Sequence, residues 1–150
     1  MKKENELLIL AVGNPSRGDD GLGPQFISEL KKRNIESQHY SWIYQLSIEH
    51  AENFAQFNTV LIVDAKKGGD SPFTFERISA SEDCHFSTHI LLPQNILSLT
   101  RYLYQANPNV YLLAIAGQDF DLSENLGHTA KINLAHAVNF VIERFDALKT

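Results

Sequence analysis

The sequence predicts an α/β protein with three layers, in which helices cover both faces of a mixed, mostly parallel sheet. Continuous apolar runs at residues 7–12, 59–65 and 110–116 are typical of central strands that are buried on both faces. Segments with helical spacing of apolar residues alternate with these strands. No repeat, low-complexity tract or linker interrupts the pattern, so we expect a single domain over residues 1–150.

Two further segments predict outer strands. Residues 38–44 alternate polar and aromatic side chains, as expected for a strand near the edge of the sheet. Residues 73–78 alternate as well, and they follow a glycine-rich connection at residues 66–72. That connection is too short to hold a crossover helix, so this strand is predicted to run antiparallel to its neighbour.

Four helices are predicted between and after the strands. They cover residues 24–33, 48–57 and 93–104, and a final helix carries an apolar stripe from Leu134 to Leu148. Ser47 is the expected N-cap of the second helix. Ile96, Leu99 and Leu103 are expected on the buried face of the third.

The composition excludes several classes of protein. The 150 residues carry a formal charge of -5 with scattered basic residues, which disfavours nucleic acid or an anionic membrane as a partner. The single cysteine, Cys84, excludes an internal disulfide and a multi-cysteine zinc site. We identify no signal peptide and no apolar stretch near the roughly 20 residues that cross a bilayer. The expectation is a soluble, cytoplasmic protein.

A glycine-rich loop at residues 13–23 follows the first apolar run and carries the adjacent carboxylates Asp19 and Asp20. Phosphate sites in such loops need amide donors and a cation, so two carboxylates instead indicate a cation-binding loop. In a turn, one of the two is expected to point inward, and the other is expected to cap the helix that begins near Pro24. The alternative is a tight turn with a helix cap and no metal.

Asp64 and His89 complete the candidate site, because ligands of open α/β sheets bind outside the carboxyl ends of strands. Asp64 ends a buried run, where an ionised carboxylate calls for a metal or a lysine as partner. The alternatives to a metal are a solvated strand end and a salt bridge with Lys66 or Lys67. His89 lies in a loop before the helix at residues 93–104, with His85 as a rival four residues earlier. The alternative is that His89 is a surface or hydrogen-bonded loop histidine and no ligand. Two carboxylates and an imidazole suit Zn, Ni, Fe or Mn with coordination positions left open.

The remaining histidines and acidic residues are expected to be structural or exposed. This group contains His39, His50, His128, His136, Asp119, Asp121 and Glu124. Ser123 is the expected cap of the final helix.

Three motifs resemble those of the hydrogenase maturation proteases, nickel-dependent endopeptidases that trim the C-terminus of the large subunit of nickel-iron hydrogenases. Residues 13–23 match the pattern Gly-Asn-x-x-x-x-Asp-(Glu/Asp)-Gly-x-Gly without an insertion. Val63-Asp64-Ala65 matches a buried strand that ends in Asp-Ala, and Ser87-Thr88-His89 matches an element just before a helix. The order and spacing of the three motifs agree with the family.

The resemblance implies a phosphorylase/hydrolase-like α/β/α fold with a five-stranded sheet and one antiparallel strand. It also implies that Asp20, Asp64 and His89 bind the metal. The chain departs from the family pattern where Asp20 replaces the Glu of many members, where Ile90 replaces a small residue or Glu, and where the loop at residues 117–123 is short.

The expected function is cleavage of one peptide bond near the C-terminus of a nickel-loaded hydrogenase large-subunit precursor. The divalent metal is expected to be nickel supplied by that precursor, and Asp19 is expected to act as a base or to orient the loop. A monomer is the expected state. The alternatives are a non-catalytic, metal-sensing maturation chaperone and a small-molecule hydrolase or nucleotide binder on the same fold. The nucleotide version is disfavoured because the chain has no Gly-x-Gly-x-x-Gly and no Lys after Gly18.

Overall fold

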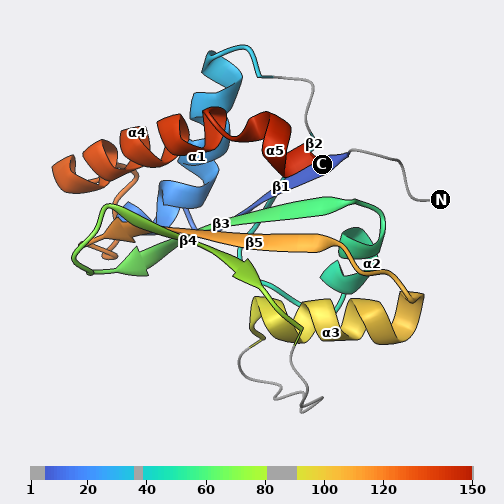
Figure 1. The fold of residues 1–150 in the computed structure, drawn as a ribbon. Coiled ribbons are helices and arrows are strands. Elements are labelled where there is room, and N and C mark those ends of the chain that lie inside the picture. The colour runs from blue at the N-terminus through green and yellow to red at the C-terminus, as the bar shows by residue number, and fades with distance from the viewer. Residues whose placement is uncertain (1–5, 36–38, 81–90, 150) are drawn as a thin grey trace.

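The computed structural model describes residues 6–35, 39–80 and 91–149 and contains a five-stranded sheet. The strands stand in the order β2-β1-β3-β5-β4 (Figure 1). Their bounds are β1 (Leu7–Val12), β2 (His39–Ile43), β3 (Thr59–Lys67), β4 (Phe73–Ile78) and β5 (Asn109–Gly117). The strands β2, β1, β3 and β5 pair in parallel, and β4 pairs antiparallel with β5. The predicted mixed sheet with one antiparallel strand is therefore confirmed.

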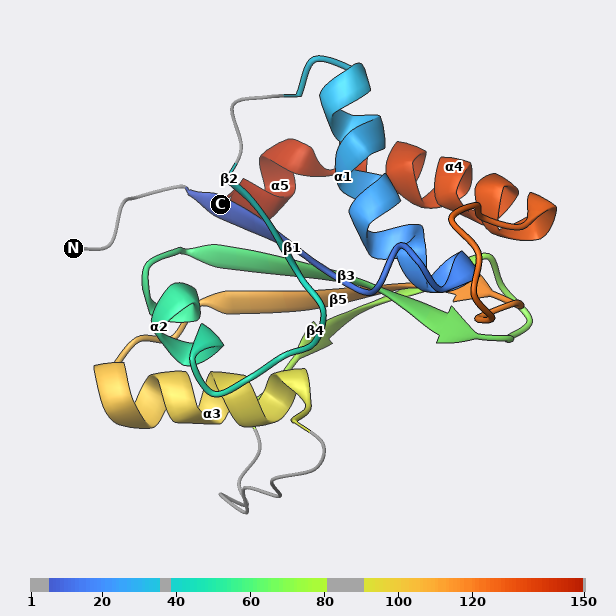
Figure 2. The same ribbon diagram turned by 180° about the vertical axis from the view of Figure 1, so that it is seen from behind.

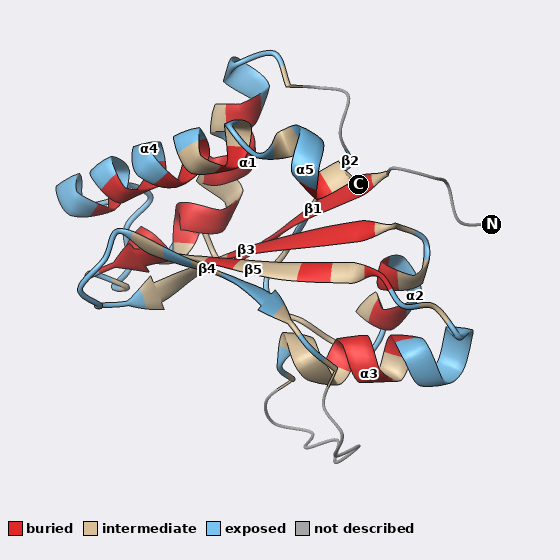
Figure 3. Cartoon of the chain, in the orientation of Figure 1, coloured by how far each residue is buried: buried red, intermediate tan, exposed pale blue. Residues whose placement is uncertain are grey.

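Helices cover both faces of this sheet, as Figures 1 and 2 show from opposite sides. One layer contains α1 (Leu22–Lys32), α4 (His128–Ile142) and α5 (Phe145–Lys149), and the other contains α2 (His50–Ala55) and α3 (Pro93–Tyr104). Alternate residues of β1 enter the two cores: Leu7 and Ile9 pack on the α1 side, and Leu8 and Leu10 pack on the α3 side. The central strands are accordingly buried along most of their length (Figure 3). No helix in the described ranges is long and apolar enough to cross a membrane.

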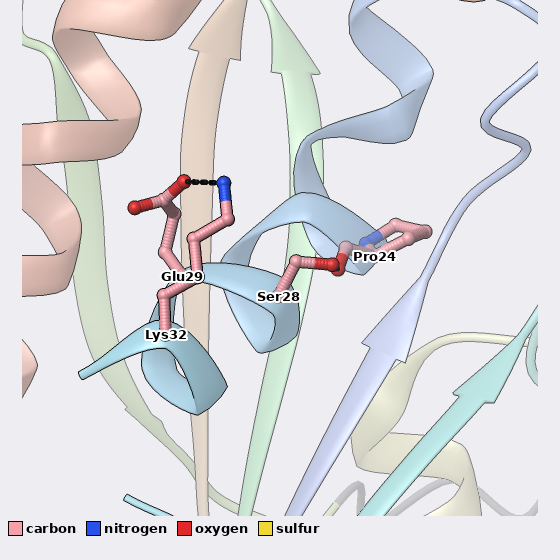
Figure 4. Close-up of polar contacts among 4 residues, drawn as sticks. All are labelled: Pro24, Ser28, Glu29 and Lys32. Carbon is pink, nitrogen blue, oxygen red and sulfur yellow. Dashed lines mark hydrogen bonds and ion pairs between the residues drawn. The ribbon is translucent and has the colours of Figure 1, made fainter. Parts of the chain in front are cut away.

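Helix α1 packs directly on the ends of two central strands. A Cβ at Gly23 would lie 2.6 Å from the Val12 carbonyl oxygen and 2.8 Å from that of Val63, so only glycine allows this approach. The helix begins at Leu22, two residues before the predicted start. Its outer side is polar: Glu29 accepts from Lys32 Nζ at 3.2 Å, and Ser28 donates to the Pro24 carbonyl at 3.4 Å (Figure 4).

The prediction of one continuous final helix is wrong. Helix α4 ends at Ile142 and α5 begins at Phe145. The Arg144 N–H donates to the Val141 carbonyl at 2.9 Å, which tightens the turn between the two helices. The apolar stripe still reaches the core, because Leu148 in α5 is buried with Val141 of α4.

Two details of the middle helices also differ from the predictions. The N-cap of α2 is Glu49, and Ser47 instead donates its N–H to His50 Nδ1 at 2.8 Å. Leu103 is 50% exposed, because the buried face of α3 is turned toward α2. Thr100 shows this orientation, since its buried hydroxyl contacts the Ala51 carbonyl of α2 at 3.2 Å.

Candidate metal and active site

Asp19 lies in the short 3-10 helix η1 (Gly18–Gly21), in the connection that follows β1. Its side chain links this connection by hydrogen bonds to the connection that follows β5. Asp19 is only 1% exposed. Its Oδ2 accepts the N–H groups of Gln118 at 2.7 Å and Asp119 at 3.1 Å, and its Oδ1 accepts that of Gly127 at 2.8 Å. Helix α1 has no side-chain cap, so the predicted cap near Pro24 is not formed, and Asp19 instead holds the connection between β5 and α4.

Backbone contacts extend this junction. Gly18 N–H donates to the Ser123 carbonyl at 2.8 Å, and Ser123 N–H donates to the Ser16 carbonyl at 3.1 Å. A Cβ at Gly117 would lie 2.6 Å from the Cβ of Asp19, so the close approach of the two connections requires glycine there. Ser123 is therefore part of this junction and does not cap α4, whose N-cap is Gly127 without a side-chain hydrogen bond.

The environment of Asp19 stabilises its ionised form. Burial alone raises the pKa of this carboxyl, but the backbone N–H groups of Gln118, Gly127 and Asp119 outweigh burial and bring the pKa below its usual value. The buried negative charge is thus fully compensated by backbone donors.

The Asp20 carboxylate contacts the beginning of the same loop. Its Oδ2 accepts the Asn14 N–H at 2.8 Å, and the residue is half-buried. Gly13 has a φ of 146°, and a Cβ there would lie 2.0 Å from the Asp20 carbonyl oxygen. Glycine at position 13 therefore lets the end of β1 pass directly against Asp20.

Asp64 lies in β3 and is half-buried, and its Oδ1 accepts the Ala65 N–H at 2.8 Å. The pKa of Asp64 is raised to about 6: burial raises it most, the Ala65 N–H partly offsets burial, and the negative charge of Asp20 raises it further. The fold therefore brings the Asp20 and Asp64 carboxylates close enough to repel each other. Within the described ranges, Asp64 forms no salt bridge with Lys66 or Lys67.

A pocket with a volume of about 590 Å³ opens beside Asp64 on the α3 side of the sheet. Its walls include Val12 and Ile62 of the central strands, and Gln45 and Ser47 from the segment that follows β2. One carboxylate thus faces a mainly apolar space, which is the usual composition of a ligand or peptide pocket.

The third candidate ligand, His89, lies outside the described residues, as do its rival His85 and Cys84. Leu91 is described, and it lines the same pocket as Asp64. Among the residues that the structure describes, no group of three or more His, Cys, Asp or Glu side chains could hold a metal ion. The metal trio with His89 therefore stays a prediction.

The remaining histidines of the described ranges contact residues other than Asp64 or are exposed. His39 pairs with Glu6 at 3.3 Å, and His50 contacts the backbone of Ser47. The side chains of His128 and His136 are exposed on α4.

The acidic residues after β5 belong to the polar loop that was expected there. Asp119, Asp121 and Glu124 are all exposed, and Asp119 Oδ1 accepts the Asp121 N–H at 3.0 Å.

One feature near the site was missed from the sequence. The Trp42 indole in β2 donates through Nε1 to the Gly13 carbonyl at 2.8 Å, which places an aromatic ring against the glycine-rich loop. The alternating aromatic residues of this segment were the available signal, but they indicated only an edge strand.

No protein-family model and no curated protein matches the sequence. Solved structures match nearly the whole chain. The hydrogenase maturating endopeptidase HybD from E. coli has a TM-score of 0.73 at 19% identity over 95% of this chain and 93% of that chain. The [NiFe] hydrogenase maturation protease HycI from Thermococcus kodakarensis KOD1 has a TM-score of 0.71 at 20% identity over 95% and 94%. A hydrogenase 2 maturation peptidase from Thaumarchaeota archaeon SCGC_AB-539-E09 has 0.68 at 18% identity over 92% and 96%. The chain therefore has the fold of the hydrogenase maturation endopeptidases, as the motif resemblance implied.

Proposed function

We propose that this chain is an endopeptidase that removes the C-terminal extension of a nickel-loaded hydrogenase large-subunit precursor. The main support is the approach of Asp20 and Asp64 at the carboxyl ends of β1 and β3, beside a pocket, within the fold of HybD and HycI. The motif resemblance assigns the same two residues to the site. The expected setting is the cytoplasm, with the protein acting as a monomer.

The donor set suits a divalent metal. Two carboxylates that repel each other are stabilised when a cation lies between them, and nickel accepts both carboxylate and imidazole ligands. Asp20 and Asp64 would bind the metal together with His89, and the nickel of the precursor is the proposed ion. When bound, such an ion polarises the scissile carbonyl and lowers the pKa of an attacking water to about 7.

Asp64 sets the pH range in which this binding works. With its pKa raised to about 6, its carboxyl is mostly ionised at neutral pH and becomes protonated below pH 6. Since only the carboxylate is a good ligand, protons compete with the metal at Asp64 below that pH.

We assign Asp19 a positioning role and not that of a general base. Both of its oxygens accept backbone N–H groups, and its side chain is closed to solvent. A base must reach the proton that it takes, and Asp19 has no access to a substrate. Its contribution is to hold the two connections that frame Asp20.

The direct test incubates the protein with unprocessed large subunit, with and without inserted nickel, and follows the mass of its C-terminus. We expect cleavage only of the nickel-loaded subunit, and none with Asp20→Asn. Asp119→Asn is the matched control, because it changes an exposed acid in the adjoining loop. Absence of cleavage in the nickel-loaded sample, or full cleavage by Asp20→Asn, would contradict the proposal. Complex formation with an unchanged mass would indicate a non-catalytic chaperone instead.

The third ligand is tested by a pair of histidine variants. His89→Gln is expected to abolish cleavage, and His85→Gln is expected to retain it. The reverse outcome would assign the imidazole ligand to His85.

A further inference from the structure

We propose that the open edge of β2 binds an extended segment of the precursor next to the scissile bond, as an added strand of the sheet. This inference rests on the proposed endopeptidase function and names the surface that delivers the substrate. Three features meet at the carboxyl end of β2: an open strand edge, a pair of exposed aromatic side chains on one face of the sheet, and a pocket on the opposite face.

The carboxyl end of this edge presents the peptide groups of Trp42 for pairing. Strand β2 is terminal in the sheet, and in the described part of the chain it pairs only with β1. The Ile43 carbonyl accepts the Gly13 N–H at 3.0 Å, so the peptide groups of Ile43 face β1. Because successive residues of a strand direct their peptide groups to opposite sides, the N–H and C=O of Trp42 face away from β1. They are the groups that an added strand would bond.

Aromatic side chains line one face of this edge. Trp42 is 47% exposed and Tyr44 is 64% exposed, and their ring centroids lie 5.3 Å apart. The hydrogen bond from the indole to Gly13 fixes the Trp42 ring beside the loop that carries Asp20. Exposed tryptophan and tyrosine side chains give a large contact area, and both residue types are enriched at the residues that dominate binding in protein interfaces.

The opposite face of the edge leads into the pocket. Gln45, Leu46 and Ser47 continue the chain directly from the end of β2 and line the same cavity as Asp64. Trp42 lies on the α1 side of the sheet with Tyr40, whereas Ile43 and Leu46 pack on the α3 side. The edge is therefore bounded by aromatic rings on one face and by a pocket on the other.

This arrangement selects an extended polypeptide as the occupant. Side chains of an extended chain alternate between two faces, so a segment along β2 would place one residue against the aromatic pair and the next toward the pocket. Since β2 is parallel to β1, its carboxyl end lies at the end of the sheet that holds Asp20 and Asp64. A segment bound there would continue toward the two carboxylates. It would reach them in an extended conformation, with its peptide bonds accessible to attack.

The chain offers a direct probe, because Trp42 is its only tryptophan. Protein labelled with 5-fluorotryptophan gives a single resonance in a fluorine NMR spectrum. The unlabelled precursor contains no fluorine and therefore contributes no signal. We expect that resonance to shift and saturate when the nickel-loaded precursor is added. In the cleavage assay, Tyr44→Ala is expected to raise KM by about tenfold, the loss typical of an aromatic contact, with kcat changed by less than about twofold. Tyr102→Ala is the control, since this tyrosine is 76% exposed on α3 away from β2.

The outcomes separate the two proposals. If the wild-type protein cleaves the precursor, but the resonance stays in place and Tyr44→Ala keeps the wild-type KM, the docking surface is wrong and the endopeptidase stands. If the resonance shifts without any cleavage, the endopeptidase is wrong and the docking surface stands. A shift that depends on protein concentration alone, with a doubled mass in solution, would assign the edge to a second copy of the chain and overturn the inference.

Discussion

Two carboxylates lie at the same end of the sheet: Asp19, between the connections that follow β1 and β5, and Asp64, beside the pocket. Their surroundings shift the pKa of the carboxyl group in opposite directions. Asp19 receives three backbone N–H groups, and its pKa is below the usual value. Asp64 receives one, from its own neighbour, and its pKa is raised to about 6. A carboxylate whose hydrogen bonds are complete contributes to structure, whereas one that is buried with few donors and a nearby like charge is available to bind a cation.

The largest expected effect is on activity at the pocket. Asp64→Asn should reduce cleavage of the nickel-loaded precursor by more than about 100-fold, because Asp64 is a proposed metal ligand and loss of a direct ligand lowers activity more than loss of a residue that only contacts a ligand. The same variant should keep or increase its free energy of unfolding at neutral pH, since it removes a repulsion with Asp20. Mass spectrometry of the precursor and urea unfolding measure the two quantities. Full activity of the Asp64→Asn variant would show that Asp64 is not part of the active site.

The Asp19 junction should respond in the opposite manner, with a large effect on stability. Asp19→Ala leaves three backbone N–H groups without their acceptor, and we expect a loss of about 3 kcal/mol in the free energy of unfolding. Asp119→Ala is the control, because this exposed residue should change stability by less than about 0.5 kcal/mol. Equal urea midpoints for the two variants would contradict the structural role of Asp19.

The pH dependence of stability should distinguish the two carboxylates by sign. The raised pKa of Asp64 means that the folded state binds more protons than the unfolded state between about pH 4 and 6. Its contribution is present below that range and is lost as the pH rises through it, by at most about 3 kcal/mol. Asp19, with a lowered pKa, contributes stability above its unfolded pKa, and this is lost as the pH falls.

Unfolding of the wild type and Asp64→Asn from pH 4 to 7 measures the Asp64 contribution. The wild type should lose stability relative to the variant across this range. Parallel curves for the two proteins would show that the environment of Asp64 does not perturb its titration.

The smallest expected effect tests the close approach at Gly117. Gly117→Ala should cost about 1–3 kcal/mol, because the new methyl group would lie 2.6 Å from the Cβ of Asp19. Gly68→Ala meets no atom within 4 Å, although its φ of 71° carries a backbone cost of about 1 kcal/mol. Thermal unfolding measures the loss of stability in both variants. Gly68→Ala reports backbone strain alone, so any larger loss in Gly117→Ala reports crowding against Asp19. A smaller loss for Gly117→Ala than for Gly68→Ala would argue against a tight junction.

Much of the fold could be predicted because side-chain patterns report burial. The sequence segments that form β1, β3 and β5 are apolar on both faces. The connection before Phe73 is too short for a crossover helix, which predicted the antiparallel orientation of β4. The approach of Asp20 and Asp64 followed from the rule that parallel strands end at one edge. The break between α4 and α5 carried no such signal, because Leu148 continues the apolar stripe across it.

The partners of Asp19 could not be predicted, because they are backbone N–H groups. Every residue except proline carries one, so the identities of Gln118 and Asp119 gave no indication that they would contact Asp19. The role of Trp42 was hidden for a different reason. An aromatic residue in an edge strand satisfies strand propensity whether or not its indole bonds to a distant loop.

The hydrogen bonds of Asp19 also have a consequence for the order in which the protein folds. They join positions 99, 100 and 108 residues apart in the sequence of 150 residues, so forming them carries the entropic cost of closing a loop of about two-thirds of the chain. During synthesis, Asp19 leaves the ribosome long before Gln118, Asp119 and Gly127 exist to donate their N–H groups to its carboxylate. The contacts that frame Asp20 therefore cannot form before the segment after β5 has been synthesised, and a nascent chain that lacks this segment carries Asp19 without its three N–H donors.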